Sequence, residues 1–363
     1  MPKRSRQQAR DPKQIVYLWG AGATQAEISY LGAGTLNLLM QDSDLGEGIA
    51  TRILQRLPMK VQSSFLTEYG TDIEKLISLL AASTVSGYEK LAGQIRRFYF
   101  KDICENLAGA KILSGPKLAI GLLEMHNNVT FEKQEVLSGI ITTNHDGLLQ
   151  LAMQHVNGSV NIGIQFESNN LVSGASAVLL LQLHGSFTWT FGLPIKVTPL
   201  RKNSLYSPDT VWIPPAILKE SKNYPFNKLA GLAYEMLSKR CDVLRIVGAS
   251  LTQNDWNILS MIFNAQRHRE LSRGQPFRVE LIMPQQSGEE ISRECSYLRN
   301  LTPIGQLTDG DFAEYKEQDV INPDMKNPLF YWLKQKLQFH SRQGHLGTIG
   351  LTSVMSQIAG ETL

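Results

Sequence analysis

Short runs of apolar residues, bounded by turn-forming residues, recur along the chain. Five of them are nearly continuous in valine, isoleucine and leucine: 15–19, 139–142, 177–183, 243–247 and 277–283. They lack the strict alternation of a strand with one face in water. Strands that are buried on both faces of a parallel sheet have this continuous pattern. The pattern therefore predicts an α/β fold built on a doubly wound parallel sheet.

Between the first two runs, the apolar residues follow the period of an α-helix instead. One helical face is shared by Ile73, Leu76, Ile77 and Leu80. Thr71 and Glu74 have the spacing of a capping box, in which a hydroxyl and a carboxylate bind free amides of the first turn. The pattern predicts a helical insertion over 42–135.

A second, less regular excursion covers 188–240, where Pro214 and Pro215 interrupt it and a helical pattern returns near 229–237. No repeat of fixed period is visible, and the ends are of low complexity. We therefore expect one domain over 14–340, preceded by a basic flexible segment, 1–13, and followed by a tail, 341–363.

The composition is that of a soluble protein with few charges. Hydrophobic residues make up 42% and charged residues 19% of the chain, and the net charge is +3. The charged fraction lies below the roughly 25% that is usual, which is compatible with surface buried in a homo-oligomer, as we expect here. Much of the positive charge lies in 1–13. We interpret this segment as a solvated terminus, so any contact with nucleic acid is expected to be indirect at most.

Three cysteines, Cys104, Cys241 and Cys295, lie far apart. This pattern indicates neither a disulfide framework nor a zinc ribbon, and no metal site is expected. No signal-peptide pattern follows the basic start, and no run of about 18 apolar residues is present. We expect a cytoplasmic protein without a membrane partner.

The first apolar run ends in a turn of small residues, Gly20, Ala21, Gly22, Ala23 and Thr24. Glycine lets backbone amides approach a phosphate, and a helix N-terminus carries partial positive charge, so a pyrophosphate fits such a turn. A dehydrogenase fingerprint would have a third glycine where this chain has Gln25, although Asp42 lies at about the expected distance for ribose. A purely structural turn between a strand and a helix remains the alternative.

Polar residues also follow the other runs. The second run ends in Thr142, Thr143, Asn144, His145 and Asp146; the third in His184; the fourth in Gly248, Ala249 and Ser250; and the fifth in Pro284. An Asx-turn would explain the second group, and a lone histidine is often structural. However, ligands of open α/β sheets bind where the carboxyl ends of the strands meet. We therefore predict that these residues face one crevice.

In this order the motifs resemble those of the sirtuins, and more closely the bacterial sirtuin-like branch found in anti-phage defence. The turn at 20–24 looks like the family's NAD-binding loop, and 143–146 looks like its Gln-Asn-Ile-Asp segment. His184 with Gly185 resembles the catalytic histidine motif, and 248–251 is similar to the turn that holds the nicotinamide-side phosphate and ribose. The resemblance implies a Rossmann-like, sirtuin-like fold over about 15–285, without the helical insertions.

The sequence departs from the deacetylating sirtuins in two respects. Their Gly-Ile-Pro-Asp-Phe-Arg segment is replaced by 25–30, and three scattered cysteines cannot supply two Cys-x-x-Cys pairs for zinc. Water, the acceptor in the defence members, is therefore the expected acceptor here. The resemblance implies an NAD hydrolase that releases nicotinamide and ADP-ribose and so depletes NAD during infection.

The resemblance also implies the site residues. Asn144 is expected to position ribose hydroxyls and water, Asp146 to orient the nicotinamide side, and His184 to act as general base. The residues expected to contact NAD are Gly20, Ala21, Gly22, Ala23, Thr24, Thr143, Gly248, Ala249, Ser250 and Pro284. The resemblance implies an activator as well, such as a HerA-type ATPase, self-assembly or a phage component. A non-catalytic sensor of NAD or ADP-ribose and an NAD-dependent protein deacylase remain the alternative functions.

Overall fold

The structure is a computed structural model of the whole chain. It describes residues 11–30, 37–40, 42, 46–69, 72–109, 115–127, 135–168, 178–198, 206–216, 219, 222–249, 251 and 253–282. The tail predicted at 341–363 lies outside the described residues, as does most of the basic segment predicted at 1–13.

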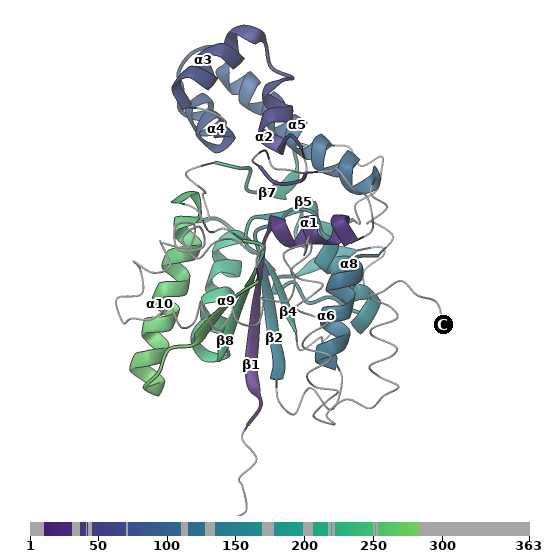
Figure 1. The fold of residues 1–363 in the computed structure, drawn as a ribbon, viewed down its shortest axis with the longest axis vertical. Coiled ribbons are helices and arrows are strands. Elements are labelled where there is room, and N and C mark those ends of the chain that lie inside the picture. Colours follow the sequence, from purple (N-terminus) through teal and green to yellow (C-terminus); the bar gives the residue numbers. More distant parts are fainter. Residues whose placement is uncertain are drawn as a thin grey trace, which may run out of the picture.

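A five-stranded sheet forms the centre of the molecule (Figure 1). Its strands are β1 (Lys13–Trp19), β2 (Glu135–Thr142), β4 (Leu179–Gln182), β8 (Val243–Val247) and β9 (Arg278–Ile282). All neighbouring pairs are parallel. Each of the five predicted runs forms one of these strands, so the parallel sheet is confirmed.

The strand order is β4-β2-β1-β8-β9. From β1 the chain builds outward through β2 to β4, and then crosses to the other side of β1 to add β8 and β9. The order therefore reverses between β1 and β8. In sheets of this kind, the crevice at the carboxyl ends beside such a reversal is where ligands bind.

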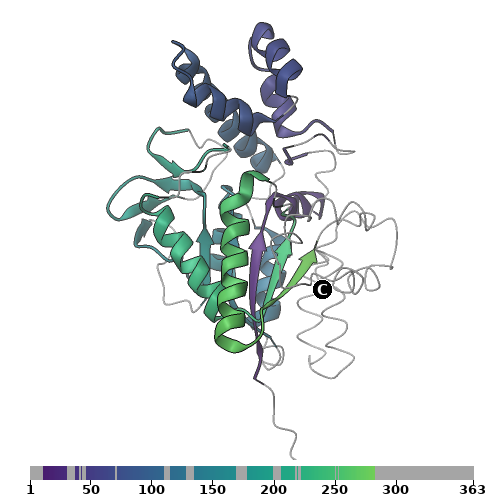
Figure 2. The same cartoon turned by 90° about the vertical axis from the view of Figure 1, so that its left-hand side faces the viewer.

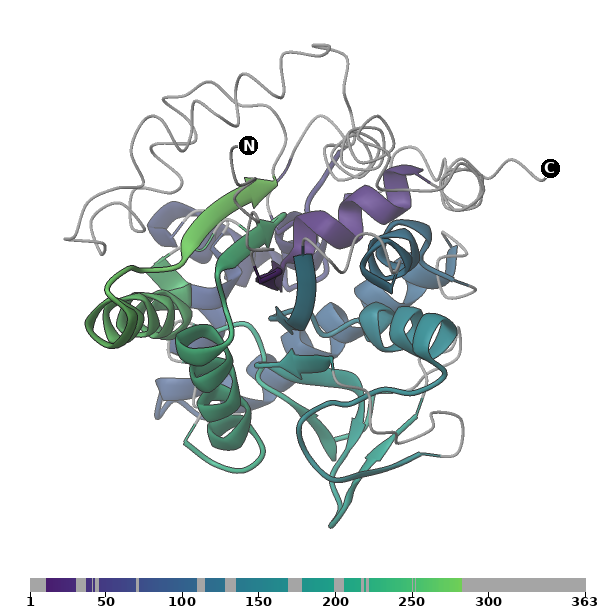
Figure 3. The same ribbon diagram turned by 90° about the horizontal axis from the view of Figure 1, so that it is seen from below.

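Helices cover both faces of the sheet (Figure 3). One face carries α1 (Ala21–Tyr30), α6 (Lys117–Asn127) and α8 (Leu148–Asn157), and the other carries α9 (Phe226–Lys239) and α10 (Trp256–Arg273). The apolar residues of the strands pack between these two layers in the main core. The doubly wound α/β fold is thereby confirmed.

Four helices stand above the carboxyl ends of the strands (Figures 1 and 2). They are α2 (Ile49–Leu54), α3 (Met59–Tyr69), α4 (Ile73–Ala82) and α5 (Tyr88–Gly109). They form a second core, which also takes in Ile28 of α1, Leu148 of α8 and Phe187. Helix α6 packs in the main core instead, so the helices of 42–135 divide between the two cores. We call α2–α5 the helical lobe.

The start of α4 differs from the predicted capping box. Asp72, rather than Thr71, is the N-cap residue, and its carboxylate accepts a hydrogen bond from the Lys75 amide. An aspartate at this position binds the free amides of the first turn as well as a threonine does. The carboxylate of Glu74 does not reach back to the cap, because it is bound to Lys219.

A small second sheet contributes residues to both cores. It contains β3 (Phe166–Ser168), β5 (Gly185–Thr190), β6 (Ile195–Val197) and β7 (Thr210–Trp212), in the order β3-β6-β5-β7. The excursion at 188–240 therefore contains strands, followed by α9 on the main sheet. Among the described helices, none is both long and apolar enough to cross a membrane.

Candidate functional site

The turns that follow β1 and β8 are in direct contact where the strand order reverses. The Gly20 amide donates to the Val247 carbonyl at 2.9 Å, and the Gly22 amide donates to the Gly248 carbonyl at 2.8 Å. Gly248 has a φ of +58°, and a Cβ atom there would lie 2.3 Å from the Ala23 nitrogen. Packing between the two turns thus requires glycine at 248, whether or not a phosphate binds.

The same contacts restrict what this turn can offer to a phosphate. The Gly22 and Ala23 amides both donate within the protein, to the Gly248 and Gly20 carbonyls. Ala21, the first residue of α1, is exposed, and its amide donates to no described residue. The N-terminus of this ten-residue helix carries partial positive charge. An anion would therefore meet one open amide here rather than a cradle of several.

Asn144, after β2, connects its own turn to the turn after β1. Its Nδ2 donates to the Gly20 carbonyl at 2.9 Å and to the Thr24 Oγ1 at 3.0 Å. Thr24 in turn donates to Asp146 at 2.7 Å. Both amide hydrogens of Asn144 are thus directed into the protein, whereas its Oδ1 has no partner among the described residues. That oxygen is available to accept a hydrogen bond from a hydroxyl or a water.

Asp146 is buried, and its carboxylate is bound by neighbouring groups of the protein. Its carboxylate accepts hydrogen bonds from Thr24, from the Leu148 amide at 2.9 Å, and from Asn144. Burial raises the pKa of Asp146, and these hydrogen bonds oppose the rise. Asp146 therefore holds the turns after β1 and β2 together. Thr143, next to Asn144, is partly exposed.

His145, to which the sequence assigned no role, lies within an aromatic cluster. Its Nε2 is 3.0 Å from the Ile213 carbonyl, and its Nδ1 is 3.5 Å from the Tyr99 hydroxyl. The rings of Phe187 and Trp212 pack against it with centroids 5.2 and 5.1 Å away. Burial lowers the pKa of His145 to about 3, so the imidazole is neutral near pH 7. No local sequence signal reveals this cluster, because its members come from distant segments.

His184 follows β4 and lies beside His145. The two rings stack with centroids 6.2 Å apart, and His184 is 8% exposed. Neither ring nitrogen of His184 has a hydrogen-bond partner among the described residues. Burial, followed by the charge of Lys219, lowers the pKa of His184 well below 6.5. His184 is therefore a neutral and weakly basic imidazole near pH 7.

The structure thus brings most of the predicted positions together. The turns at 20–24, 144–146 and 248–249 share contacts, and the Leu183 amide donates to the Thr142 carbonyl at 2.9 Å, which ties the end of β4 to the end of β2. Ala249 lies against Gly20, where an added Cβ would be 2.5 Å from the Ala249 Cβ. Ser250 and Pro284 lie outside the described residues.

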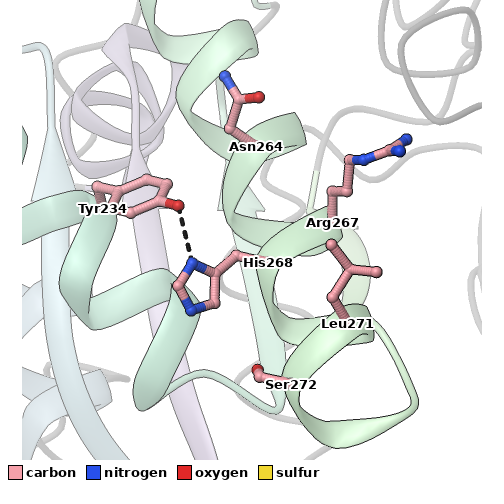
Figure 4. A pocket seen from close by; sticks show the side chains of 6 residues that line it. All are labelled: Tyr234, Asn264, Arg267, His268, Leu271 and Ser272. Carbon is pink, nitrogen blue, oxygen red and sulfur yellow. Dashed lines mark hydrogen bonds between the residues drawn. The ribbon is translucent and has the colours of Figure 1, made fainter.

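One surface hollow lies elsewhere, on the flank formed by α9 and α10 (Figure 4). Its volume is about 600 Å³, and its lining residues are Tyr234, Asn264, Arg267, His268, Leu271 and Ser272. None of the predicted site residues lines it. Within the described part of the chain, no three His, Cys, Asp or Glu side chains are grouped so as to hold a metal ion.

Comparisons with known proteins give a remote likeness. Neither a family model nor a curated protein matches the sequence. Among solved structures, two mutant forms of a Sir2 homologue, each in complex with ADP-ribose, match 80% of this chain and 94% of their own. Both are 13% identical to this chain, with TM-scores of 0.38 and 0.39. The likeness concerns the fold only, and no residue role is taken from it.

Proposed function

We propose that the chain binds NAD at the carboxyl edge of the main sheet and hydrolyses it to nicotinamide and ADP-ribose. The observation that carries the proposal is the state of His184. A buried, neutral imidazole without a hydrogen-bond partner among the described residues lies beside the turn that presents Asn144 Oδ1. A titratable group whose pKa is strongly shifted, at the edge of the sheet where ligands bind, is a candidate for a role toward a ligand.

The reaction needs few groups from the protein. The bond between the ribose C1 and the pyridinium nitrogen breaks, and its electron pair stays on the nitrogen, which becomes neutral. A water oxygen forms the new bond at C1, and a proton of that water passes to His184. Asn144 Oδ1 holds the water or a ribose hydroxyl in line. The transition state resembles an oxocarbenium ion, as in other glycoside hydrolysis.

Other residues of the candidate site hold Asn144 in place and supply the point at which the pyrophosphate binds. Asp146, through Thr24, keeps the Asn144 amide hydrogens bound within the protein, and so leaves Oδ1 as the group of Asn144 that can accept from a ligand. The exposed amide of Ala21, at the start of α1, is the point at which a pyrophosphate would bind. Gly248 sets the distance between that point and the turn after β8.

The test is to replace His184 and follow nicotinamide release. A positioned general base contributes about 100- to 10,000-fold, so His184→Ala is expected to lower kcat by that factor while NAD still binds. Asn144→Ala is expected to lower kcat similarly. His155→Ala makes the same change on the exposed surface of α8 and should leave kcat unchanged. Full activity of folded His184→Ala protein would remove the histidine from the mechanism.

The second candidate function is a sensor that binds NAD or ADP-ribose without cleaving it. The strongly lowered pKa of His184 favours it, because a weakly basic imidazole accepts a proton reluctantly. Calorimetric binding of NAD together with complete recovery of intact NAD would establish the sensor. Protein deacylation is the third candidate, and release of nicotinamide only in the presence of an acyl-lysine peptide would establish it.

An enzyme that depletes NAD requires control, and we propose that control comes from assembly or from a partner protein. A defence role against phage, with a HerA-type ATPase as activator, follows from the motif resemblance alone. Light scattering of the purified protein, alone and with its genomic neighbour's product, tests both ideas. A monomer that releases nicotinamide at full rate by itself would contradict them.

A further inference from the structure

Lys219, in the connection between β7 and α9, joins three segments that are far apart in the sequence. Its Nζ lies 2.7 Å from Asp255 in η2 (Gln253–Asp255), the short helix that follows the turn after β8, and 3.4 Å from Glu74 in α4 of the helical lobe. The Lys219 side chain is only 8% exposed, and both carboxylates are largely covered. The cluster is therefore a shielded junction rather than a surface ion pair.

Further hydrogen bonds fix the same junction. The side chain of Asn254 donates to the Glu74 carboxylate, and Asn257 donates to the Lys219 carbonyl at 3.3 Å. Burial raises the pKa of Glu74, and the charge of Lys219 opposes the rise. Helix α4 is thus fastened to the segment that directly follows the turn containing Gly248.

The charges of the junction act on the histidine pair, which the lobe contacts through Tyr99. Burial lowers the pKa of both His145 and His184, and the charge of Lys219 lowers it further, while the hydrogen bond with Ile213 opposes the shift at His145. The charge of Glu74 likewise reaches Tyr99 of α5, whose hydroxyl is 3.5 Å from His145. Where water is excluded, the effective dielectric constant is low, and charges influence one another's pKa values without direct contact. The lobe, the junction and the two imidazoles therefore share one shielded region.

We propose that Lys219 is a positioning residue of the candidate site, which clamps α4 to the segment after β8 and so holds the helical lobe over His145 and His184. This inference rests on the proposed function insofar as it concerns catalysis. The clamp is ionic and nearly buried, so a displacement of the lobe separates Glu74 from Lys219 and disturbs the packing of Tyr99 on His145. A movement of the lobe would therefore change the surroundings of His184.

The charges around the pair come from several elements. Lys219 lies in the connection before α9, Tyr99 in α5 and Asp146 after β2, while Glu74 and Asp255 are bound to Lys219. Lys219→Met removes the one positive charge of this set and leaves the two carboxylates unpaired. The pKa of His184 should then rise, and the lobe should loosen.

The experiment uses the full chain labelled at its seven histidines for an NMR titration of the imidazoles, together with a nicotinamide-release assay. Lys219→Met is expected to raise the apparent pKa of His184 and to lower kcat by about 100-fold, the cost of misplacing a reacting group by about 1 Å. Lys219→Arg keeps the charge, so the pKa of His184 and kcat should both lie close to their wild-type values. Lys239→Met removes an exposed lysine paired with Glu235 and should change neither.

A second variant covers the case in which Lys219→Met fails to fold. Glu74→Gln keeps the shape of the side chain and weakens the clamp, so the amides of α4 should exchange faster with deuterium than in the wild type. Unchanged exchange in Glu74→Gln, or an unchanged His184 titration in folded Lys219→Met, would overturn the proposal. A shifted titration in protein that never cleaves NAD would refute the proposed function and leave the clamp standing.

Discussion

The buried imidazole of His145 makes the stability of the fold depend on pH in a calculable way. In the folded protein the pKa of His145 is about 3, whereas an unfolded imidazole has a pKa near 6.5. Protons therefore bind the unfolded chain more readily, and the free energy of unfolding contributed by this residue falls as the pH drops below about 6.5. The loss continues until the pH reaches about 3.

The size of the effect follows from the same two values. One pKa unit corresponds to about 1.4 kcal/mol, so at about pH 5 protonation of the unfolded imidazole costs the fold about 2 kcal/mol. Glu27 has the opposite influence, because burial raises its pKa to about 7 and its protonation favours the folded state. The pH profile of the wild type alone is therefore not diagnostic, and a comparison with a variant is needed.

His145→Gln is the suitable variant, since its amide keeps a donor for the Ile213 carbonyl and does not titrate. At about pH 8 it should be less stable than the wild type, because it lacks the ring packed on Phe187 and Trp212. At about pH 5 that deficit should shrink by about 2 kcal/mol. Urea unfolding of both proteins at the two pH values measures the change. A deficit that is the same at both values would show that His145 is not a buried neutral imidazole.

Three further changes test the packing that holds the site. Gly248→Ala should destabilise the protein by at least about 1–2 kcal/mol, since its φ is positive and the new Cβ meets the Ala23 backbone, and thermal unfolding will show it. Arg245→Met should cost about 3–5 kcal/mol, because Arg245 is 1% exposed and pairs with Glu135 through two bonds, and a loss under 1 kcal/mol would contradict a buried pair. Asp72→Ala removes the cap of α4 and should cost about 1 kcal/mol in urea unfolding.

The main sheet could be predicted because its strands are buried on both faces. A segment such as 243–247 is apolar at nearly every position, and this pattern is visible in the local sequence without knowing which strands lie beside it. The meeting of the turns that follow these strands could be predicted for a similar reason, since parallel strands end at one edge. Asn144 and His184, which follow β2 and β4, were singled out as candidates in this way.

The rest depends on contacts between distant segments. The strands β3, β6 and β7 have three residues each, too few to show a period, and their order is set by pairing partners far along the chain. The residue Lys219 likewise has no motif around it. Its ion pairs form only when the fold places Glu74 and Asp255 beside it, 145 and 36 positions away in the chain.

The central claim is that water cleaves NAD at this site with His184 as the base. In the most direct measurement, the protein is incubated with NAD in water enriched in heavy oxygen, alone and with its genomic neighbour's product. The mass of the ADP-ribose that forms is then measured by mass spectrometry. The account predicts nicotinamide and ADP-ribose in equal amounts, with one heavy oxygen in each ADP-ribose, and release of both products about 100- to 10,000-fold more slowly by His184→Ala. NAD that binds and is recovered intact under both conditions would contradict it.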